Sequence, residues 1–281
     1  MTPSHVVVES TPSLIQDHQR IWILVLIYVM ERLLEKRDTR LAAAGSADEP
    51  PEWVQEAYRG LREMLLDPRD PFPCYFGTIA ERLGTLRYTY LEEEEVGDPI
   101  GFRDSMLAFL KEVPSVSGRS ALIVFVGEKT HGNALDTYET VFWNLMQYLH
   151  DHDPQPWPAH IPTDPDDPGW EFCFAGVTWF FTGHAPAYQR RKSRSADGGL
   201  MLIIQTRDNL QGIVGTGLVP ESVRRRIRTS VNTYDAIPVS PELQIYGEPA
   251  TREWKQYWLL DSNNSRDGTC PLIITRCTRE G

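Results

Sequence analysis

One segment of the chain, residues 157–194, combines the residue types that a haem pocket needs. It reads WPAHIPTDPDDPGWEFCFAGVTWFFTGHAPAYQRRKSR, an aromatic-rich apolar run that ends at His184 and is followed by Arg190, Arg191 and Arg194. A porphyrin ring needs apolar burial, its iron needs an axial base, and its two propionates need cations. The segment therefore predicts a haem site in which these arginines hold the propionates. The same pattern also fits a core hairpin that ends in a solvated basic loop.

Cys74 is a second candidate for the axial ligand. It follows Pro73 directly and precedes a short helical segment, in a loop crowded with aromatic residues. A helix N-terminus stabilises a thiolate, and a thiolate ligand donates electron density in a way that suits oxygen activation. The alternative is a small hydrophobic side chain buried in a turn. The choice between His184 and Cys74 stays open, with a preference for His184 because its neighbours supply the rest of a pocket.

The sequence lacks the motifs of several common enzyme classes. It contains no GxGxxG fingerprint, no GxxxxGK[ST] phosphate loop, no GxSxG elbow and no HExxH. His150, His152 and Asp153 have the composition of a metal cluster. Histidines at the polar C-terminal end of a helix more often stabilise the helix dipole, so we do not expect a metal site there.

Composition narrows the class of protein further. The chain has 281 residues and a net charge of −11, which argues against a nucleic-acid partner. Its four cysteines show no CxxC pair, so a reducing cytoplasm is expected. The apolar run IWILVLIYVM at residues 21–30 is too short to span a bilayer. It predicts a buried or interface helix, and a homodimer contact is our hypothesis for it.

Apolar periodicity predicts a mixture of helices and strands that together form an α+β fold. A mixed β-sheet flanked by helices is expected, in one domain. Helices are predicted over residues 14–43, 52–66, 78–83, 138–150 and 220–234, and strands over residues 86–91, 121–126 and 200–205. A hairpin is predicted over residues 171–181, turning at Ala175 and Gly176, and 121–126 is expected to be central in the sheet. Residues 1–51 are expected to form a helical N-terminal extension and residues 52–281 the haem-binding domain.

Six blocks of the sequence resemble the YqcI/YcgG-type proteins, in the same order. They are FPCYFGTIAE at 72–81, FWNLMQYLHDHD at 142–153, PWPAHIPTDPDDPGWEFCFAG at 156–176, PAYQRRKSR at 186–194, RRRIRTSVNTYD at 224–235 and REWKQYWLLD at 252–261. The resemblance extends over roughly residues 52–272.

This resemblance implies a cytoplasmic haem protein. Characterised members of the family are haem-dependent N-hydroxylases of guanidine groups, and one converts L-arginine to Nω-hydroxy-L-arginine in D-cycloserine biosynthesis. The implied partners are L-arginine or a similar guanidine, dioxygen or peroxide, and an electron-donor protein. Because the sequence has no CxxCH attachment motif, the expected cofactor is non-covalent haem b. A non-catalytic haem-binding or haem-sensing protein is the alternative, since the same pocket would suffice.

Two further residues are candidates for the reaction that the resemblance implies. A guanidinium substrate needs a buried carboxylate, and Glu171 lies between Trp170 and Phe172 in the aromatic run. Trp170 is the expected aromatic contact to the cofactor. Tyr188 is the second candidate catalytic residue, at a position where many relatives carry histidine. The relatives' histidine therefore has no counterpart at position 188 of this chain to serve as an axial ligand, and His184 lies four residues earlier.

Overall fold

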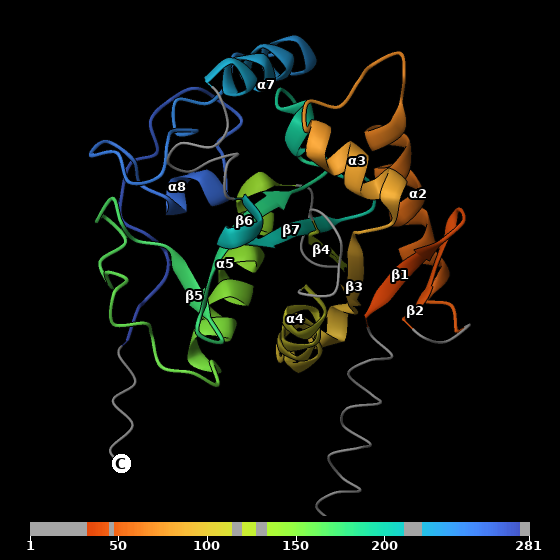
Figure 1. The fold of residues 1–281 in the computed structure, drawn as a ribbon, viewed down its shortest axis with the longest axis horizontal. Helices are drawn as coiled ribbons and strands as arrows, with labels where there is room; N and C mark the ends of the chain where they lie inside the picture. The colour runs from red at the N-terminus through yellow and green to blue at the C-terminus, as the bar shows by residue number, and fades with distance from the viewer. Residues whose placement is uncertain (1–32, 45–47, 114–119, 128–133, 211–220, 276–281) are drawn as a thin grey trace, which may run out of the picture.

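A single seven-stranded mixed sheet organises the protein, as expected from the sequence. The structure is a computed structural model that describes residues 33–44, 48–113, 120–127, 134–210 and 221–275. The strand order is β2-β1-β3-β4-β7-β6-β5 (Figure 1). Only β3 and β4 pair in parallel, and every other neighbouring pair is antiparallel. The sheet is open, so the predicted α+β class is confirmed.

The fold contains the predicted strands and helices from residue 52 onward, together with elements that were not predicted, among them β1, β2, α4 and α8. The strands are β1 (Leu34–Arg37), β2 (Arg40–Ala43), β3 (Arg87–Leu91), β4 (Leu122–Val126), β5 (Phe172–Phe174), β6 (Val177–His184) and β7 (Leu200–Thr206). The α-helices are α2 (Glu52–Leu66), α3 (Tyr75–Leu83), α4 (Ile100–Glu112), α5 (Leu135–Asp151), α6 (Arg207–Leu210), α7 (Glu221–Tyr234) and α8 (Trp254–Tyr257), with 3-10 turns η1 (Glu93–Glu95) and η3 (Lys192–Arg194).

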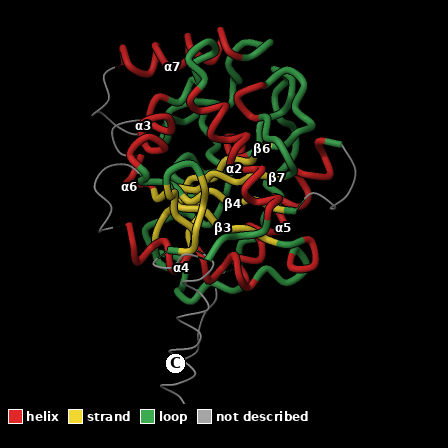
Figure 2. Tube along the Cα trace, turned by 90° about the vertical axis from the view of Figure 1, so that its right-hand side faces the viewer, coloured by secondary structure: helices red, strands yellow, loops and turns green. Residues whose placement is uncertain are grey.

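Helices cover both faces of the sheet, which explains why its middle strand, β4, is apolar at every position. Figure 2 shows the strands in the middle of the molecule with helices around them. One buried cluster packs α2 and α3 against the sheet, and a second packs α4, α5 and α8 against the opposite face. All five residues of β4 are buried, and β4 is the middle strand of the sheet. A strand that is covered on both faces reads as a continuous apolar run.

The β5–β6 hairpin forms where it was predicted. Ala175 and Gly176 have φ values of 54° and 74°, so both turn residues occupy the left-handed region that a tight two-residue hairpin turn requires. The register pairs Phe174 with Val177 and Phe172 with Trp179. Because side chains alternate across a strand, this turn fixes which residues of β6 face each side of the sheet.

The prediction of a helix over residues 14–43 is wrong in its C-terminal part. Residues 34–43 form the antiparallel hairpin β1–β2, and Leu34 pairs with Tyr88 of β3. Asp38, with φ 55°, supplies the turn. The sequence LEKRDTRLAA has no strong helix breaker, so its local preference allowed a helix, but pairing with the edge of the sheet buries Leu34 and Leu41. The predicted helix at 21–30, with its homodimer contact, lies outside the described residues.

None of the helices within the described ranges is long and apolar enough to cross a membrane. The division of the chain at residue 51 stays a prediction, although β1 and β2 share the sheet of the main domain.

Candidate functional site

A cavity of about 340 Å³ lies between one face of the sheet and the helices that cover it. Alternate residues of three neighbouring strands form its sheet wall: Ile123 of β4, Ile203 and Gln205 of β7, and Phe180, Thr182 and His184 of β6. The opposite wall is formed by α2, α3 and the loop between them, through Leu61, Leu65, Phe72, Cys74, Phe76 and Ala80. The mainly apolar lining, with a few polar groups, is typical of a small-molecule or cofactor site.

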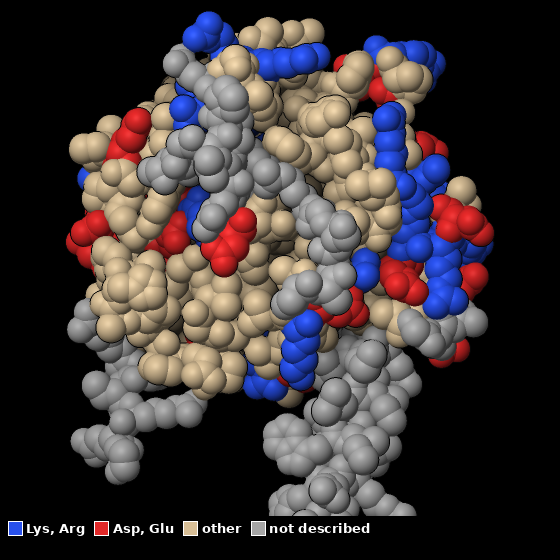
Figure 3. All heavy atoms as spheres, viewed as in Figure 1, with Lys and Arg blue, Asp and Glu red and all other residues tan. Residues whose placement is uncertain are grey.

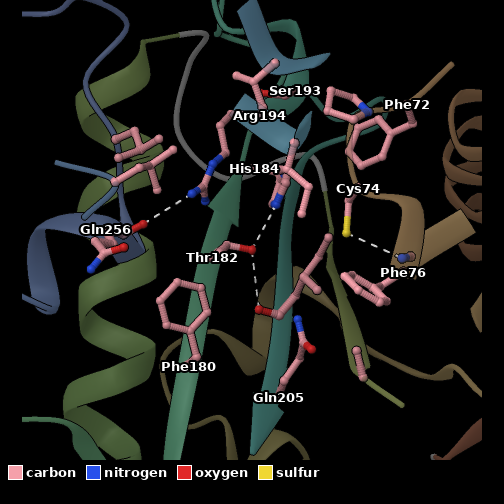
Figure 4. A pocket seen from close by; sticks show the side chains of 18 of the residues that line it. Phe72, Cys74, Phe76, Phe180, Thr182, His184, Ser193, Arg194, Gln205 and Gln256 are labelled. Carbon is pink, nitrogen blue, oxygen red and sulfur yellow. Dashed lines mark hydrogen bonds between the residues drawn. The ribbon is translucent and has the colours of Figure 1, made fainter. Parts of the chain in front are cut away.

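His184 is the buried base of the sheet wall. It is only 4% exposed, and its Nε2 shares a hydrogen bond of 3.0 Å with Oγ1 of Thr182, two residues earlier on the same face of β6 (Figure 4). Burial, with a smaller effect from the charge of Arg194, lowers the pKa of His184 well below its usual value. The imidazole is therefore neutral near pH 7. Its Nδ1 has no hydrogen-bond partner among the described residues.

Cys74 enters the same cavity from the helical wall. It is the N-cap residue of α3, and its Sγ accepts a hydrogen bond from the backbone N–H of Gly77 at 3.4 Å. In Figure 4, Cys74 comes from the α3 side of the pocket and His184 from the sheet. An N–H donor and the positive end of a helix dipole both stabilise a thiolate. The structure thus brings the two candidate axial ligands to one cavity.

Two of the three predicted arginines also line the cavity. Arg191 is 1% exposed, and its guanidinium donates to the carbonyl oxygens of Leu260, Pro238 and Ser262 and to the side chain of Asn263. Arg194 is also buried, but within the described part of the chain it donates only to the carbonyl oxygen of Gln256, at 3.2 Å. Arg190 is exposed and is not among the cavity-lining residues.

Helix α7 closes one side of the cavity with alternating cationic and apolar residues. Arg224, Ile227, Arg228 and Val231 line the cavity, and their spacing of three and four residues places them on one face of the helix. Figure 3 shows lysine and arginine atoms along the top of the molecule, where α7 lies. A cationic border of this kind favours ligands that carry negative groups.

Asp235, directly after α7, is the acidic residue of the cavity lining. Its carboxylate accepts hydrogen bonds from the backbone N–H of Ser193 at 2.7 Å and from the Ser193 hydroxyl at 2.9 Å. Burial raises the pKa of Asp235, and the bonds from Ser193 and the charges of Arg191 and Arg194 oppose that rise. A carboxylate can accept further hydrogen bonds, so Asp235 can still bind a cationic ligand.

Glu171 lies outside this cavity. It is buried and forms an ion pair with Arg207, which also pairs with Glu253. The guanidinium of Arg207 lies 4.5 Å from the ring centre of Tyr246. Glu171 thus has a guanidinium partner within the chain itself, in a buried cluster with Glu253.

Trp170 and Tyr188 also lie outside the cavity lining. Trp170 is fully buried and packs against Trp157 and Tyr257 in the cluster on the opposite face of the sheet. Tyr188 donates its hydroxyl to the carbonyl oxygen of Leu259 at 2.6 Å. Both side chains therefore belong to the packing around the site.

Sequence reasoning missed Thr182, Asp235 and the inner face of α7. A signal for Thr182 was present, because it lies two residues before His184 and alternate residues of a strand share a face. The i, i+3, i+4, i+7 spacing of Arg224, Ile227, Arg228 and Val231 was also readable. His150, which had raised the question of a metal cluster, accepts a hydrogen bond from the backbone N–H of Thr275. Within the described part of the chain, no group of three potential metal-ligating side chains lies together.

Comparison with known proteins identifies similar chains. The model of the YqcI/YcgG family matches residues 61–273. "Uncharacterized protein YcgG" of Bacillus subtilis is 32% identical over 234 residues, which cover 80% of this chain and 90% of that protein. A Streptomyces lavendulae protein named "Putative N(omega)-hydroxy-L-arginine synthase DcsA" is 28% identical over 227 residues, covering 79% of this chain and 84% of the relative. No solved structure matches the chain.

Proposed function

Because this chain belongs to the YqcI/YcgG family, we propose that it is a haem-dependent oxygenase that N-hydroxylates a guanidine group, with L-arginine as its substrate. The printed name of the Streptomyces lavendulae relative supports the reaction. The observation that carries the proposal is the single apolar cavity that Cys74, His184 and Arg194 share. It offers a sulfur ligand, a neutral base and a buried cation around one ligand space.

The cavity residues fit haem b in their chemistry. The apolar walls suit a porphyrin, and the cavity border carries cations that suit propionates. Two buried polar atoms that line the cavity, Nδ1 of His184 and Nη1 of Arg194, have no hydrogen-bond partner in the described part of the chain. Buried polar groups are normally satisfied, so these two atoms support a site that a ligand would complete.

Cys74 would hold the haem iron, in preference to His184. The sulfur of Cys74 lies at the N-terminus of α3 and accepts the N–H of Gly77, an arrangement that holds a thiolate. His184 is instead hydrogen-bonded to Thr182 through Nε2 on the other wall. A thiolate ligand also suits the cleavage of an O–O bond, which this reaction needs.

The reaction replaces an N–H bond of the guanidine with N–OH. With dioxygen, one oxygen atom enters the product and the other leaves as water, which consumes two protons and two electrons from an electron-donor protein. With peroxide, the same product forms with water and no external electrons. Haem supplies the activation of oxygen that side chains cannot provide. The chain binds the guanidine, orients it and excludes water.

Asp235 is our candidate for binding the substrate guanidinium. It is the acidic residue that lines the cavity, and it is 7% exposed. A carboxylate pairs with a guanidinium through two parallel hydrogen bonds, and this geometry orients a planar substrate. Thr182 and His184, on the sheet wall, are placed to exchange a proton with a ligand in the cavity.

The absorption spectrum of the purified protein tests the cofactor and its ligand together. With bound haem and a thiolate ligand, the ferrous carbon-monoxide band should lie at about 450 nm, whereas histidine ligation gives about 420 nm. Cys74→Ala should remove the long-wavelength band, and Cys270→Ala is the matched cysteine control. A band at about 420 nm that is lost in His184→Gln would assign the ligand to His184. A protein that takes up no hemin would refute the proposal.

Product analysis separates an oxygenase from a haem-binding protein. The haem-loaded protein should convert L-arginine to Nω-hydroxy-L-arginine with dioxygen and an electron source, or with peroxide. Haem uptake without a product under either condition would favour the non-catalytic alternative.

A further inference from the structure

We infer that Arg194 is a carboxylate-binding residue of the cavity. Arg194 lies in η3 and is 7% exposed, and its Nη2 donates to the backbone oxygen of Gln256 at 3.2 Å. Its Nη1 is buried at the cavity and has no hydrogen-bond partner among the residues that the structure describes. Figure 4 shows the guanidinium beside Gln256, close to His184 and Thr182. The inference rests on the proposed function only for the identity of the ligand.

The two neighbouring arginines differ from Arg194 in burial or in hydrogen bonding. Arg191 is buried to a similar extent, but four acceptors surround its guanidinium, so it has a structural role in joining η3 to the C-terminal segment. Arg190 is exposed, and its backbone N–H is bonded to Asp261. Of the three arginines predicted from the sequence to bind an anion, Arg194 alone combines burial at the cavity with an unpartnered guanidinium nitrogen.

The charge of Arg194 is not neutralised by a direct partner in the protein. Burial lowers the pKa of Arg194 to about 10, so the guanidinium stays charged near pH 7. Among the described residues, the hydrogen bond of Arg194 goes to a backbone oxygen and not to a carboxylate. Asp235, whose charge acts on Arg194, already accepts two hydrogen bonds from Ser193. A buried charge without a counter-ion is strongly unfavourable. A carboxylate on the ligand would neutralise the charge of Arg194 and would accept hydrogen bonds from its unpartnered guanidinium nitrogen.

Two ligands of the proposed reaction carry such a carboxylate: the propionates of haem and the α-carboxylate of an amino-acid substrate. Each of these two ligands has a close analogue that lacks the negative charge of the carboxylate. Hemin dimethyl ester has both propionates blocked, and agmatine is arginine without its carboxylate. The affinity of each pair of ligands therefore reports whether a carboxylate is recognised, and on which molecule.

The experiment measures the dissociation constants of all four ligands for the wild type, Arg194→Met and Arg194→Lys. Hemin compounds are titrated into the haem-free chain, and arginine and agmatine into the same chain with and without hemin. Arg194→Met should weaken the binding of the carboxylate-bearing member of one pair by at least about 30-fold. This corresponds to about 2 kcal/mol for a lost desolvated charge pair. The member that lacks the carboxylate should bind the variant and the wild type equally. Arg194→Lys should recover part of the lost affinity, because it restores the charge without the planar fork.

The outcomes separate the sources of the carboxylate. A selective loss for hemin assigns Arg194 to a propionate, and a selective loss for arginine assigns it to the substrate. Three results would overturn the inference. Arg194→Met could bind both carboxylate-bearing ligands as tightly as the wild type, or it could lose affinity equally for the ligands with and without a carboxylate. The wild type could also bind both members of each pair equally well. Arg190→Ala, an exposed neighbour, should leave all four constants unchanged. If hemin does not bind at all, the proposed cofactor fails, whereas the comparison of arginine with agmatine still tests Arg194.

Discussion

His184 and Thr182 form a hydrogen-bonded pair on the cavity face of β6, with Nε2 and Oγ1 3.0 Å apart. The pair exists because residues two apart on a strand share a face. The hydroxyl satisfies one ring nitrogen of a histidine that is removed from water, and the other nitrogen has no hydrogen-bond partner among the described residues. The pair therefore couples the protonation of His184 to the stability of the fold.

We expect stability to fall as the pH decreases below about 6.5, the pKa of an unfolded histidine. Burial holds the pKa of folded His184 well below that value. In this window the unfolded chain binds a proton that the folded chain does not, so each such group lowers the unfolding free energy by up to about 1.4 kcal/mol per pH unit. Urea unfolding of the haem-free protein between pH 7 and pH 5 measures the slope.

His184→Gln should make this pH dependence shallower. A smaller contribution remains from His150, whose pKa burial also lowers. His152, whose ring stacks on Tyr148 at the surface, offers the control substitution His152→Gln. An unchanged slope in His184→Gln would show that His184 does not titrate in this range.

Gly183→Ala should destabilise the fold by about 3 kcal/mol, because the core on that side of β6 has no room for a methyl group. A Cβ at Gly183 would overlap the indole ring of Trp258 and lie 3.1 Å from Cδ2 of Phe142. Denaturant unfolding measures the loss. Gly97→Ala, where nothing lies within 4 Å of the added carbon, should change the unfolding free energy little. Similar values for the two variants would contradict the packing argument.

Asp235→Asn should weaken L-arginine binding by about 2–5 kcal/mol if Asp235 holds the guanidinium. Glu171→Gln is the matched control, because that carboxylate pairs with Arg207 outside the cavity. Arginine-induced changes in the haem spectrum, or calorimetry, give the two dissociation constants. Weaker binding in Glu171→Gln alone would instead support the role expected for Glu171 from the sequence.

Glu171→Gln should mainly affect stability. Glu171→Gln removes one of the two carboxylates that pair with Arg207 and leaves the pair with Glu253 in place. The loss should therefore be smaller than the roughly 3–5 kcal/mol that is typical when a buried charge is left uncompensated. Thermal and denaturant unfolding give the value, and unchanged stability would mean that the pair with Arg207 contributes nothing net.

Tyr188→Phe should cost about 1–2 kcal/mol of stability and leave hemin affinity unchanged. The substitution removes the hydroxyl that donates to the carbonyl oxygen of Leu259 at 2.6 Å, and the buried oxygen then lacks this donor. Because Tyr188 is outside the cavity lining, the cofactor should not sense the change. Loss of hemin binding without loss of stability would support the catalytic role expected from the sequence.

The sequence by itself determined the local elements and the class of the fold. The apolar run of β4 predicted a central strand, the turn at Ala175 and Gly176 predicted the β5–β6 hairpin, and both formed as expected. These features depend on short-range periodicity and turn geometry, which neighbouring residues specify. Residues 34–43 are the exception, because their strand conformation depends on pairing with β3 rather than on local preference.

Only the tertiary structure decided which chemistry-bearing residues meet. Cys74 and His184 lie far apart in the sequence, and they share a cavity because α3 covers the same face of the sheet that carries His184. Glu171 and Arg194 belong to the same sequence segment, yet Glu171 pairs with Arg207, whereas Arg194 lines the cavity and has a guanidinium nitrogen without a partner among the described residues. Strand periodicity tells which side chains share a face, but the partner on that face comes from the long-range packing of the sheet and its helices.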